Sequence, residues 1–384
     1  MCKRSEKPIQ RTKLSIFLVS ITIFSACGSV PPKPAALLPK APISIEAYKD
    51  FRQKQGPYRI LFAGDTHFTW RVADLQQKNG LEFPVQPLQE RFLKADYRLL
   101  NLETTMSSKG KPWLQKAYIF NSAPENIALL RFLGIQTAIL GNNHSMDFGP
   151  EGLQATVAEL KNAGIAAVGA GSSWGEAASP LVVRNDLLSF AILSFSMIGE
   201  HMTFSTPGRA GVASVRANSV RSQIQSLKKE VDLVIVSLHW GVEYYTRPQP
   251  EQIKLAHLMV DAGADAVIGH HPHIVQALEV YRGSIIAYSI GNFLFGSVNE
   301  RQDNNMLLEL QCDLESRQLN AVQIYPVFGR YRENKSDPVR SLNASETNDF
   351  WKKMVVMSQN LSAETVNRLR VNKKGFGRIE LRSK

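Results

Sequence analysis

Cysteine is scarce in this chain, with three residues among 384. A scaffold built on disulfides is excluded, because such folds are dense in cysteine. Proline and glycine stand at ordinary levels, 19 and 25 residues, and show no fixed repeat, which excludes collagen-like and repeat architectures. With 44% hydrophobic and 21% charged residues, the chain has the composition of an ordinary globular protein.

Excess charge of one sign is confined to the two ends of the chain. The formal net charge is +11, but residues 1–26 contribute +4 and residues 367–384 contribute +6, which leaves about +1 for the rest. No basic stripe interleaved with aromatic residues is present in the sequence, so nucleic acid is not an expected partner. The basic C-terminal tail fits either a solvated terminus or a segment that binds a polyanion.

The first 26 residues have the pattern of an export signal. A basic opening precedes an apolar run from Leu14 to Phe24, which is too short for a membrane-spanning helix, and small residues follow. Residues 24–28 resemble a bacterial lipobox, with Phe24 in place of the usual aliphatic residue. We expect cleavage before Cys27 and a lipid on that cysteine, which would anchor the exported protein in the bacterial cell envelope. A buried N-terminal helix with an incidental cysteine is the alternative.

Residues 27–56 are predicted to form the lipidated N-terminus and a spacer. Five prolines lie between Val30 and Pro42 among Ala, Leu and Lys, a composition typical of an extended, polyproline-like segment. Because Cys2 would leave with the signal and Cys27 would be acylated, Cys312 would be the one remaining thiol. No intramolecular disulfide is therefore expected.

From residue 57 onward, short β-branched or aliphatic runs alternate with helical patterns, which predicts an α/β fold. The predicted strands are 59–63, 97–102, 137–140, 187–195, 231–238, 266–268 and 284–288. The predicted helices are 152–162, 217–230 and 250–261. Beyond about residue 296, alternation at 306–312 and 318–325 predicts antiparallel strands, and 345–370 has a helical pattern. We expect residues 57–296 to form the core and residues 297–384 to complete the same domain.

Six of the eight histidines fall in four short polar motifs, each at or just after the C-terminal end of a predicted strand or apolar run. A fifth motif, Asn101-Leu102-Glu103, adds a carboxylate after another strand. Ligands bind at this edge of open α/β sheets, because loops converge there and helix N-termini point towards it. The histidine motifs are Gly64-Asp65-Thr66-His67, Gly141-Asn142-Asn143-His144, Leu238-His239-Trp240-Gly241 and Gly269-His270-His271-Pro272-His273.

This set of side chains suits two divalent cations. At a strand end, Asp65 and His67 place an oxygen and a nitrogen on the same side, because side chains alternate with period two, and His271 and His273 repeat the spacing with two nitrogens. Carboxylate, amide and imidazole ligands without a thiolate favour Mn, Fe or Zn. Each motif alone has an ordinary alternative, such as a turn cap or a solvated loop. Together, at one edge of the sheet, they favour a metal site.

Two histidines, His201 and His257, lie outside the motifs. We therefore interpret them as surface or core histidines.

The motifs resemble those of the CapA and PgsA group of capsule-synthesis and poly-γ-glutamate-synthesis proteins, within the calcineurin-like metallophosphoesterase superfamily. The resemblance runs from about residue 59 to residue 296. It implies a metallophosphatase-like four-layer sandwich, in which two mixed β-sheets are flanked by helices. The matching motifs are 101–104, 141–149, 239–244, 269–273 and 288–293.

The resemblance further implies a dinuclear metal site and a general acid. Glu103 would stand where phosphoesterases use a bridging Asp, and His144 corresponds to the superfamily's general acid, with Asp147 placed to orient it. Glu243 and Asn292 would support the ligands. The ligands of one metal would be Asp65, His67 and His273, and those of the other Asn143, His239 and His271.

Two functions of different classes remain open. The ligand set favours a metal-dependent hydrolase of phosphoester bonds that acts on envelope material. The resemblance to polymer-synthesis proteins implies a role in making an extracellular anionic polymer, which need not involve bond cleavage. The alternative is therefore a non-catalytic accessory or anchoring component of a polymer-synthesis or export complex. A metal-stabilised structural protein is a third interpretation.

Overall fold

The computed structural model describes residues 43–46, 55–299, 304–329 and 337–382. The predicted export signal and Cys27 lie outside these residues, as does most of the predicted spacer. All described residues belong to one compact unit. Within these ranges, no helix combines the length and the apolar character that crossing a membrane requires.

The larger sheet combines the first strands of the core with the C-terminal strands. β2, β3, β6 and β7 run parallel to one another, whereas β17 pairs antiparallel with β2 and β18 extends the sheet on that side. β16 (Asn292–Leu294) pairs with β2, and β19 (Arg340–Ser341) pairs with β18. The other strands, in spatial order, are β20 (Leu369–Val371), β21 (Gly377–Glu380), β18 (Gln318–Phe328), β17 (Asn304–Asp313), β2 (Tyr58–Thr66), β3 (Tyr97–Leu102), β6 (Thr137–Ile139) and β7 (Ala166–Val168).

The second sheet has seven strands and a parallel centre. β10, β12, β13 and β15 are parallel, whereas β9 and β14 run antiparallel to their neighbours β10 and β15. The spatial order is β1 (Ile43–Glu46), β9 (Leu181–Arg184), β10 (Ser189–Ser196), β12 (Leu233–His239), β13 (Ala266–His270), β15 (Ser284–Ala287) and β14 (Leu278–Tyr281). Two strand pairs lie outside these sheets: β4 (Thr105–Met106) with β5 (Asn121–Ser122), and β8 (Ala170–Gly171) with β11 (Gly211–Val212).

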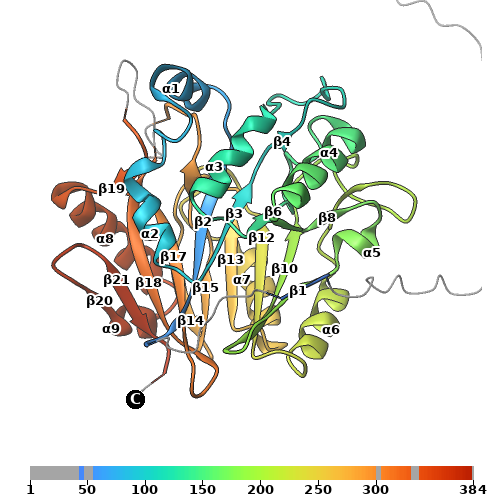
Figure 1. Cartoon of the computed structure of the whole chain (residues 1–384). Coiled ribbons are helices and arrows are strands. Elements are labelled where there is room, and N and C mark those ends of the chain that lie inside the picture. Colours follow the sequence, from blue (N-terminus) through green and yellow to red (C-terminus); the bar gives the residue numbers. More distant parts are fainter. Residues whose placement is uncertain (1–42, 47–54, 300–303, 330–336, 383–384) are drawn as a thin grey trace, which may run out of the picture. The chain divides into compact units, whose positions relative to one another are not determined.

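The two sheets pack face to face, with helices on their outer faces (Figure 1). Because side chains alternate along a strand, Ile60 and Phe62 of β2 enter the core between the sheets, while Leu61 packs towards the outer helices. Helices α1 (Arg71–Asn79), α2 (Gln89–Leu93), α3 (Ile127–Phe132) and α4 (Gly149–Asn162) cover the larger sheet. Helices α5 (Trp174–Ala177), α6 (Ala217–Leu227) and α7 (Pro250–Asp261) cover the other. Two 3₁₀ turns span Gln86–Leu88 and Pro124–Asn126.

The predicted α/β sandwich of two mixed sheets flanked by helices is confirmed. Every strand and helix predicted before residue 296 is present, with its ends shifted by a few residues. The helix pattern over 345–370 was wrong in detail. The segment forms two helices, α8 (Ala344–Gln359) and α9 (Ala363–Arg368), because Ser362 adopts an extended backbone and its side chain caps a new helix by accepting from the Thr365 N–H. Part of the basic tail is built into the larger sheet as β20 and β21.

Candidate metal centre

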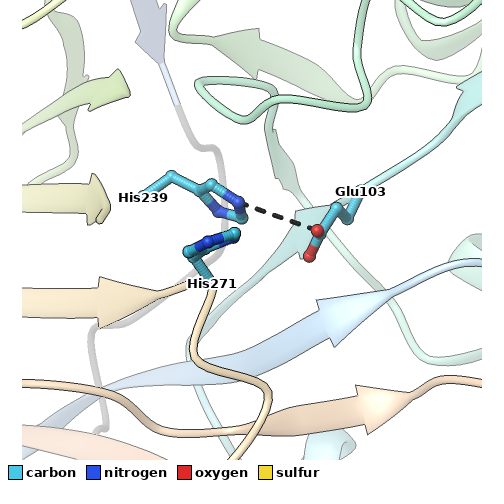
Figure 2. A group of neighbouring side chains, drawn as sticks. All are labelled: Glu103, His239 and His271. Atoms are coloured by element: carbon cyan, nitrogen blue, oxygen red, sulfur yellow. Dashed lines mark ion pairs between the residues drawn. The ribbon is translucent and has the colours of Figure 1, made fainter. Parts of the chain in front are cut away.

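The side chains singled out in the sequence lie at the carboxyl ends of parallel strands from both sheets. Asp65 belongs to the end of β2, Glu103 follows β3, and His239 ends β12. Residues 141–144 follow β6, and residues 271–273 follow β13. Figure 2 shows Glu103, from the larger sheet, facing His239 and His271, from the other sheet. The face-to-face packing of the sheets therefore assembles the cluster.

Glu103 lies at the centre of the cluster. Its Oε1 is 3.7 Å from Nε2 of His239, and 3.9 Å from Nε2 of both His273 and His144. Asp65 lies next to it, with Oδ2 3.2 Å from Nδ1 of His273 and Oδ1 3.2 Å from Nδ1 of His270. Two groups of three potential metal ligands thus share Glu103, and in each the ligand atoms lie within 4.8 Å of one another: Glu103, His239 and His271, and Asp65, Glu103 and His273.

Several of these polar atoms are buried and have no hydrogen-bond partner. Glu103 is fully buried, yet its Oε1 accepts no hydrogen bond. In the same condition within these motifs are His67 Nε2, Asn143 Oδ1, His239 Nε2, His271 Nδ1 and both ring nitrogens of His270. An unpaired polar atom in the interior costs about 1–3 kcal/mol, so seven at one place need an explanation. Bound cations would satisfy those of Glu103, His239 and His271, because each offers a lone pair and their chemistry is that of Mn, Fe or Zn ligands.

Electrostatics keeps most of the imidazoles neutral, which is the form that binds metals. Burial lowers the pKa of His239 and His67 well below the ordinary value, and that of His271 to about 3. For His273 burial acts in the same direction, but the hydrogen bond and charge of Asp65 outweigh it and raise its pKa. Burial, and then the charge of Asp65, raise the pKa of Glu103 well above its usual range. A cation at this point would reverse that balance, because it stabilises the carboxylate.

The loop that carries His271 and His273 has a strained backbone. Both residues have positive φ angles, 95° and 58°, which cost about 1–3 kcal/mol each for a residue with a side chain. A Cβ at the preceding Gly269 would lie 2.0 Å from the carbonyl oxygen of Tyr288, so only glycine allows this close approach. The fold holds two imidazoles in an unfavourable conformation, which is typical of a ligand-binding site.

The two remaining predicted ligands, His67 and Asn143, lie at the border of the cluster. The ring of His67 stacks on Phe120, with centroids 4.4 Å apart, and contacts Phe295 edge-on. Its Nδ1 accepts from the Thr69 N–H at 3.1 Å. Within the part of the chain that the structure describes, His67 belongs to no group of three potential ligands.

His144 and Asp147 form a buried pair beside Glu103. His144 Nδ1 lies 2.7 Å from Asp147 Oδ2, and since a carboxylate only accepts, Nδ1 carries the proton and donates. Its Nε2 therefore faces Glu103. Burial lowers the pKa of His144, while the hydrogen bond that it donates to Asp147 acts in the opposite direction.

Two predicted supporting residues differ in their surroundings. Asn292 Oδ1 lies 3.0 Å from Nδ1 of His273 and fixes that ring. Glu243 is exposed, but a carboxylate oxygen of it lies within 4.8 Å of ligand atoms of His271 and His273, so it forms a third group of potential ligands.

Sequence reasoning assigned no role to Asn101 and Asn142. Asn101 donates to Asp65 Oδ1 at 2.8 Å, and Asn142 donates to Asn101 Oδ1 at 3.0 Å, so the two amides connect three strand ends. The period-two spacing of Asn101 and Glu103 was a usable signal. The ammonium of Lys116 contacts Asp147 at 2.5 Å, but no sequence pattern indicated this residue, because it lies in a segment without strand or helix.

Comparisons with known proteins place this site in a family. Residues 59–297 match the model of the bacterial capsule synthesis protein PGA_cap. The chain is 30% identical over 250 residues to the PGA biosynthesis protein CapA of Bacillus subtilis, covering 65% of this chain and 66% of that protein. It is 30% identical over 257 residues to the capsule biosynthesis protein CapA of Bacillus anthracis, covering 65% and 62%. The matched part thus spans just under two thirds of these relatives.

A solved structure titled as a novel phosphatase from Mycoplasma pneumoniae superimposes with a TM-score of 0.46 at 13% identity, covering 78% of this chain and 100% of that one. The family match covers well over half of the chain, including every predicted ligand and both predicted catalytic residues. The chain therefore belongs to the bacterial capsule synthesis protein family PGA_cap.

Proposed function

We propose that the chain is a metal-dependent phosphoester hydrolase of the bacterial cell envelope, acting in the synthesis of a capsule or of poly-γ-glutamate. The observation that carries the proposal is the set of buried, unpaired ligand atoms around Glu103, next to an oriented His144–Asp147 pair. The relatives' names support the polymer process. The arrangement of ligands and acid supports the chemistry.

The site would hold two divalent ions, Mn, Fe or Zn. Asp65, Glu103 and His273 would hold one, and Glu103, His239 and His271 the other, so Glu103 belongs to both sets. Asn143, whose Oδ1 is buried and unpaired, would add an oxygen to the second set, and His67 a nitrogen to the first. When bound, such ions lower the pKa of a water ligand towards neutrality and offset phosphoryl charge.

The chain's own residues would position the substrate and move a proton. His144 Nε2 faces the cluster, so it is placed to protonate the oxygen of a departing alcohol. To do so, Nε2 must first take up a proton from solvent, because the Nδ1 proton is held by Asp147, and the Asp147 carboxylate stabilises the resulting imidazolium. General acid catalysis of this kind contributes about 10² to 10⁴ in rate.

Export and lipidation at Cys27 are part of the proposal. They rest on the N-terminal pattern of the sequence. Mass spectrometry of the protein from membrane extracts tests them, because a cleaved, diacylated N-terminus has a mass that neither the full-length nor the unmodified chain has. A soluble mature protein without lipid mass would contradict lipidation at Cys27.

The hydrolase is tested with the full chain purified in detergent and supplied with Mn²⁺. Bound metal is counted per chain, and turnover of an alkyl phosphodiester is measured for the wild type, for His144→Ala, and for the exposed control His201→Ala. We expect two ions in all three proteins, with turnover lost by about 10² or more in His144→Ala alone. Two ions without turnover would favour an accessory component of a polymer-synthesis complex. No metal would remove both mechanisms.

A further inference from the structure

Lys116 is a buried cation to which the proposed hydrolysis assigns no role. It lies in the segment between β4 and β5, and its side chain is 6% exposed. Its ammonium contacts Asp147 Oδ1 at 2.5 Å and donates to the main-chain oxygen of Asn143 at 2.7 Å. One side chain therefore joins the carboxylate that orients His144 and the backbone of a predicted metal ligand.

The surroundings leave Asp147 little freedom. It is fully buried, and its Oδ2 accepts from the Phe120 N–H at 2.7 Å as well as from His144. Lys116 occupies the other oxygen. Without that donor, Oδ1 would be a buried acceptor without a partner, and the carboxylate could turn to regain one, because a single oxygen holds both remaining donors.

We propose that Lys116 is a positioning residue for the general acid: by holding Asp147 and the 143–144 backbone, it keeps Nε2 of His144 aimed at the leaving group. The inference rests on the proposed hydrolase. Two contacts carry it, because the same ammonium holds the Asp147 carboxylate and the Asn143 carbonyl and so ties the orienting residue to the backbone next to His144. A lysine suits both tasks, since its three donors point in different directions.

The leaving group distinguishes positioning from a merely structural role. A basic alkoxide needs protonation as its bond to phosphorus breaks, whereas a p-nitrophenolate leaves without it. Loss of a positioned acid therefore slows alkyl esters much more than aryl esters. A general loss of structure or metal would slow both equally.

The test uses the full chain with Mn²⁺ and two variants at this position, Lys116→Met and Lys116→Arg, with Lys111→Met as an exposed control on the same segment. We expect Lys116→Met to lower kcat for an alkyl phosphodiester by about 10² but for bis-p-nitrophenyl phosphate by less than about threefold. KM and metal content stay unchanged. Lys116→Arg restores part of the alkyl rate, and Lys111→Met behaves as wild type. Combined with His144→Ala, Lys116→Met adds nothing further.

A second measurement is independent of turnover. In protein with ¹⁵N-labelled histidine, NMR reports whether the His144 proton resides on Nδ1. We expect that tautomer in the wild type and its loss in Lys116→Met. A wild type without turnover would defeat the proposed hydrolase and leave this measurement intact. Equal slowing of both substrates, or an unchanged His144 tautomer in Lys116→Met, would overturn the role of Lys116. Should Lys116→Met fail to fold, Lys116→Gln takes its place in both measurements.

Discussion

Two histidine–glutamate clusters in the described part of the chain differ in exposure and in how their polar atoms are paired: the His257 side chain is 29% exposed and that of His239 is 1% exposed. In the first, His257 of α7 lies with Nε2 3.1 Å from both carboxylate oxygens of Glu279, and Tyr288 donates to the same carboxylate at 2.7 Å. The His257 ring also stacks on Tyr281, with centroids 3.8 Å apart. In the second, around Glu103, neither Glu103 Oε1 nor His239 Nε2 has a hydrogen-bond partner.

The difference separates a structural cluster from a binding site. Both contain the same residue types, so composition cannot distinguish them. A satisfied network needs nothing more and stabilises the fold, whereas an unsatisfied one costs stability until a ligand supplies the missing partner. The strained loop at 271–273 falls in the second cluster, which strengthens the contrast.

The largest expected effect is the loss of metal from the unsatisfied cluster. We expect His239→Ala to weaken metal binding by about 100-fold or more, because it removes a ligand rather than a supporting group. His257→Ala, the matched control, keeps full metal content. Metal analysis after dialysis against a graded chelator measures both. Equal loss of metal in the two variants would contradict the assignment of the Glu103 cluster alone as the metal site.

A smaller effect concerns acid stability of the metal-free protein. The folded-state pKa of His271 is lowered from 6.5 to about 3, so between these values the unfolded chain binds more protons than the folded one. The contribution of His271 is therefore complete above pH 6.5 and is lost as pH falls, by about 2 kcal/mol at pH 5.

Urea unfolding in EDTA from pH 7.5 to pH 5 checks this sign. We expect His271→Asn to flatten the slope of stability against pH relative to the wild type. Identical slopes would mean that His271 is not buried as a neutral imidazole.

The smallest effect belongs to the satisfied cluster. Glu279→Gln leaves the donors of His257 and Tyr288 sharing a weaker acceptor, and we expect a loss of about 1–2 kcal/mol in stability. Metal content and turnover stay unchanged. Urea unfolding beside metal analysis measures this, and a variant that lost metal would show that the two clusters are coupled.

Much of the fold could be predicted because the signals are local. The runs at 97–102 and 187–195 are long enough to reveal strands, and the helix at 250–261 has a clear apolar period. Some of the short strands, such as β8 and β14, were missed because so few residues show no clear period. The break at Ser362 was missed because a serine inside a helical pattern shows its capping role only in the backbone conformation, which the sequence does not reveal.

The site could be predicted less completely. Their positions at strand ends identified Asp65, Glu103, His271 and His273 as candidate ligands, and the structure places all four in groups of potential metal ligands. The division of ligands between two ions stays a prediction. Lys116 was not predicted as a site residue, because it contacts Asp147, 31 residues away in the sequence, from an irregular segment.

The sequence alone determined which chemical groups stand at the strand ends, and with them the family, because side-chain identity and the alternation of strands are local properties. Only the tertiary structure decided which of those groups are paired. His257 and His239 are the same residue type, but His257 lies on a partly exposed face of α7 and bonds to Glu279, whereas His239 is buried at the end of β12 and its Nε2 has no hydrogen-bond partner. That depends on packing between the two sheets, which no local pattern encodes.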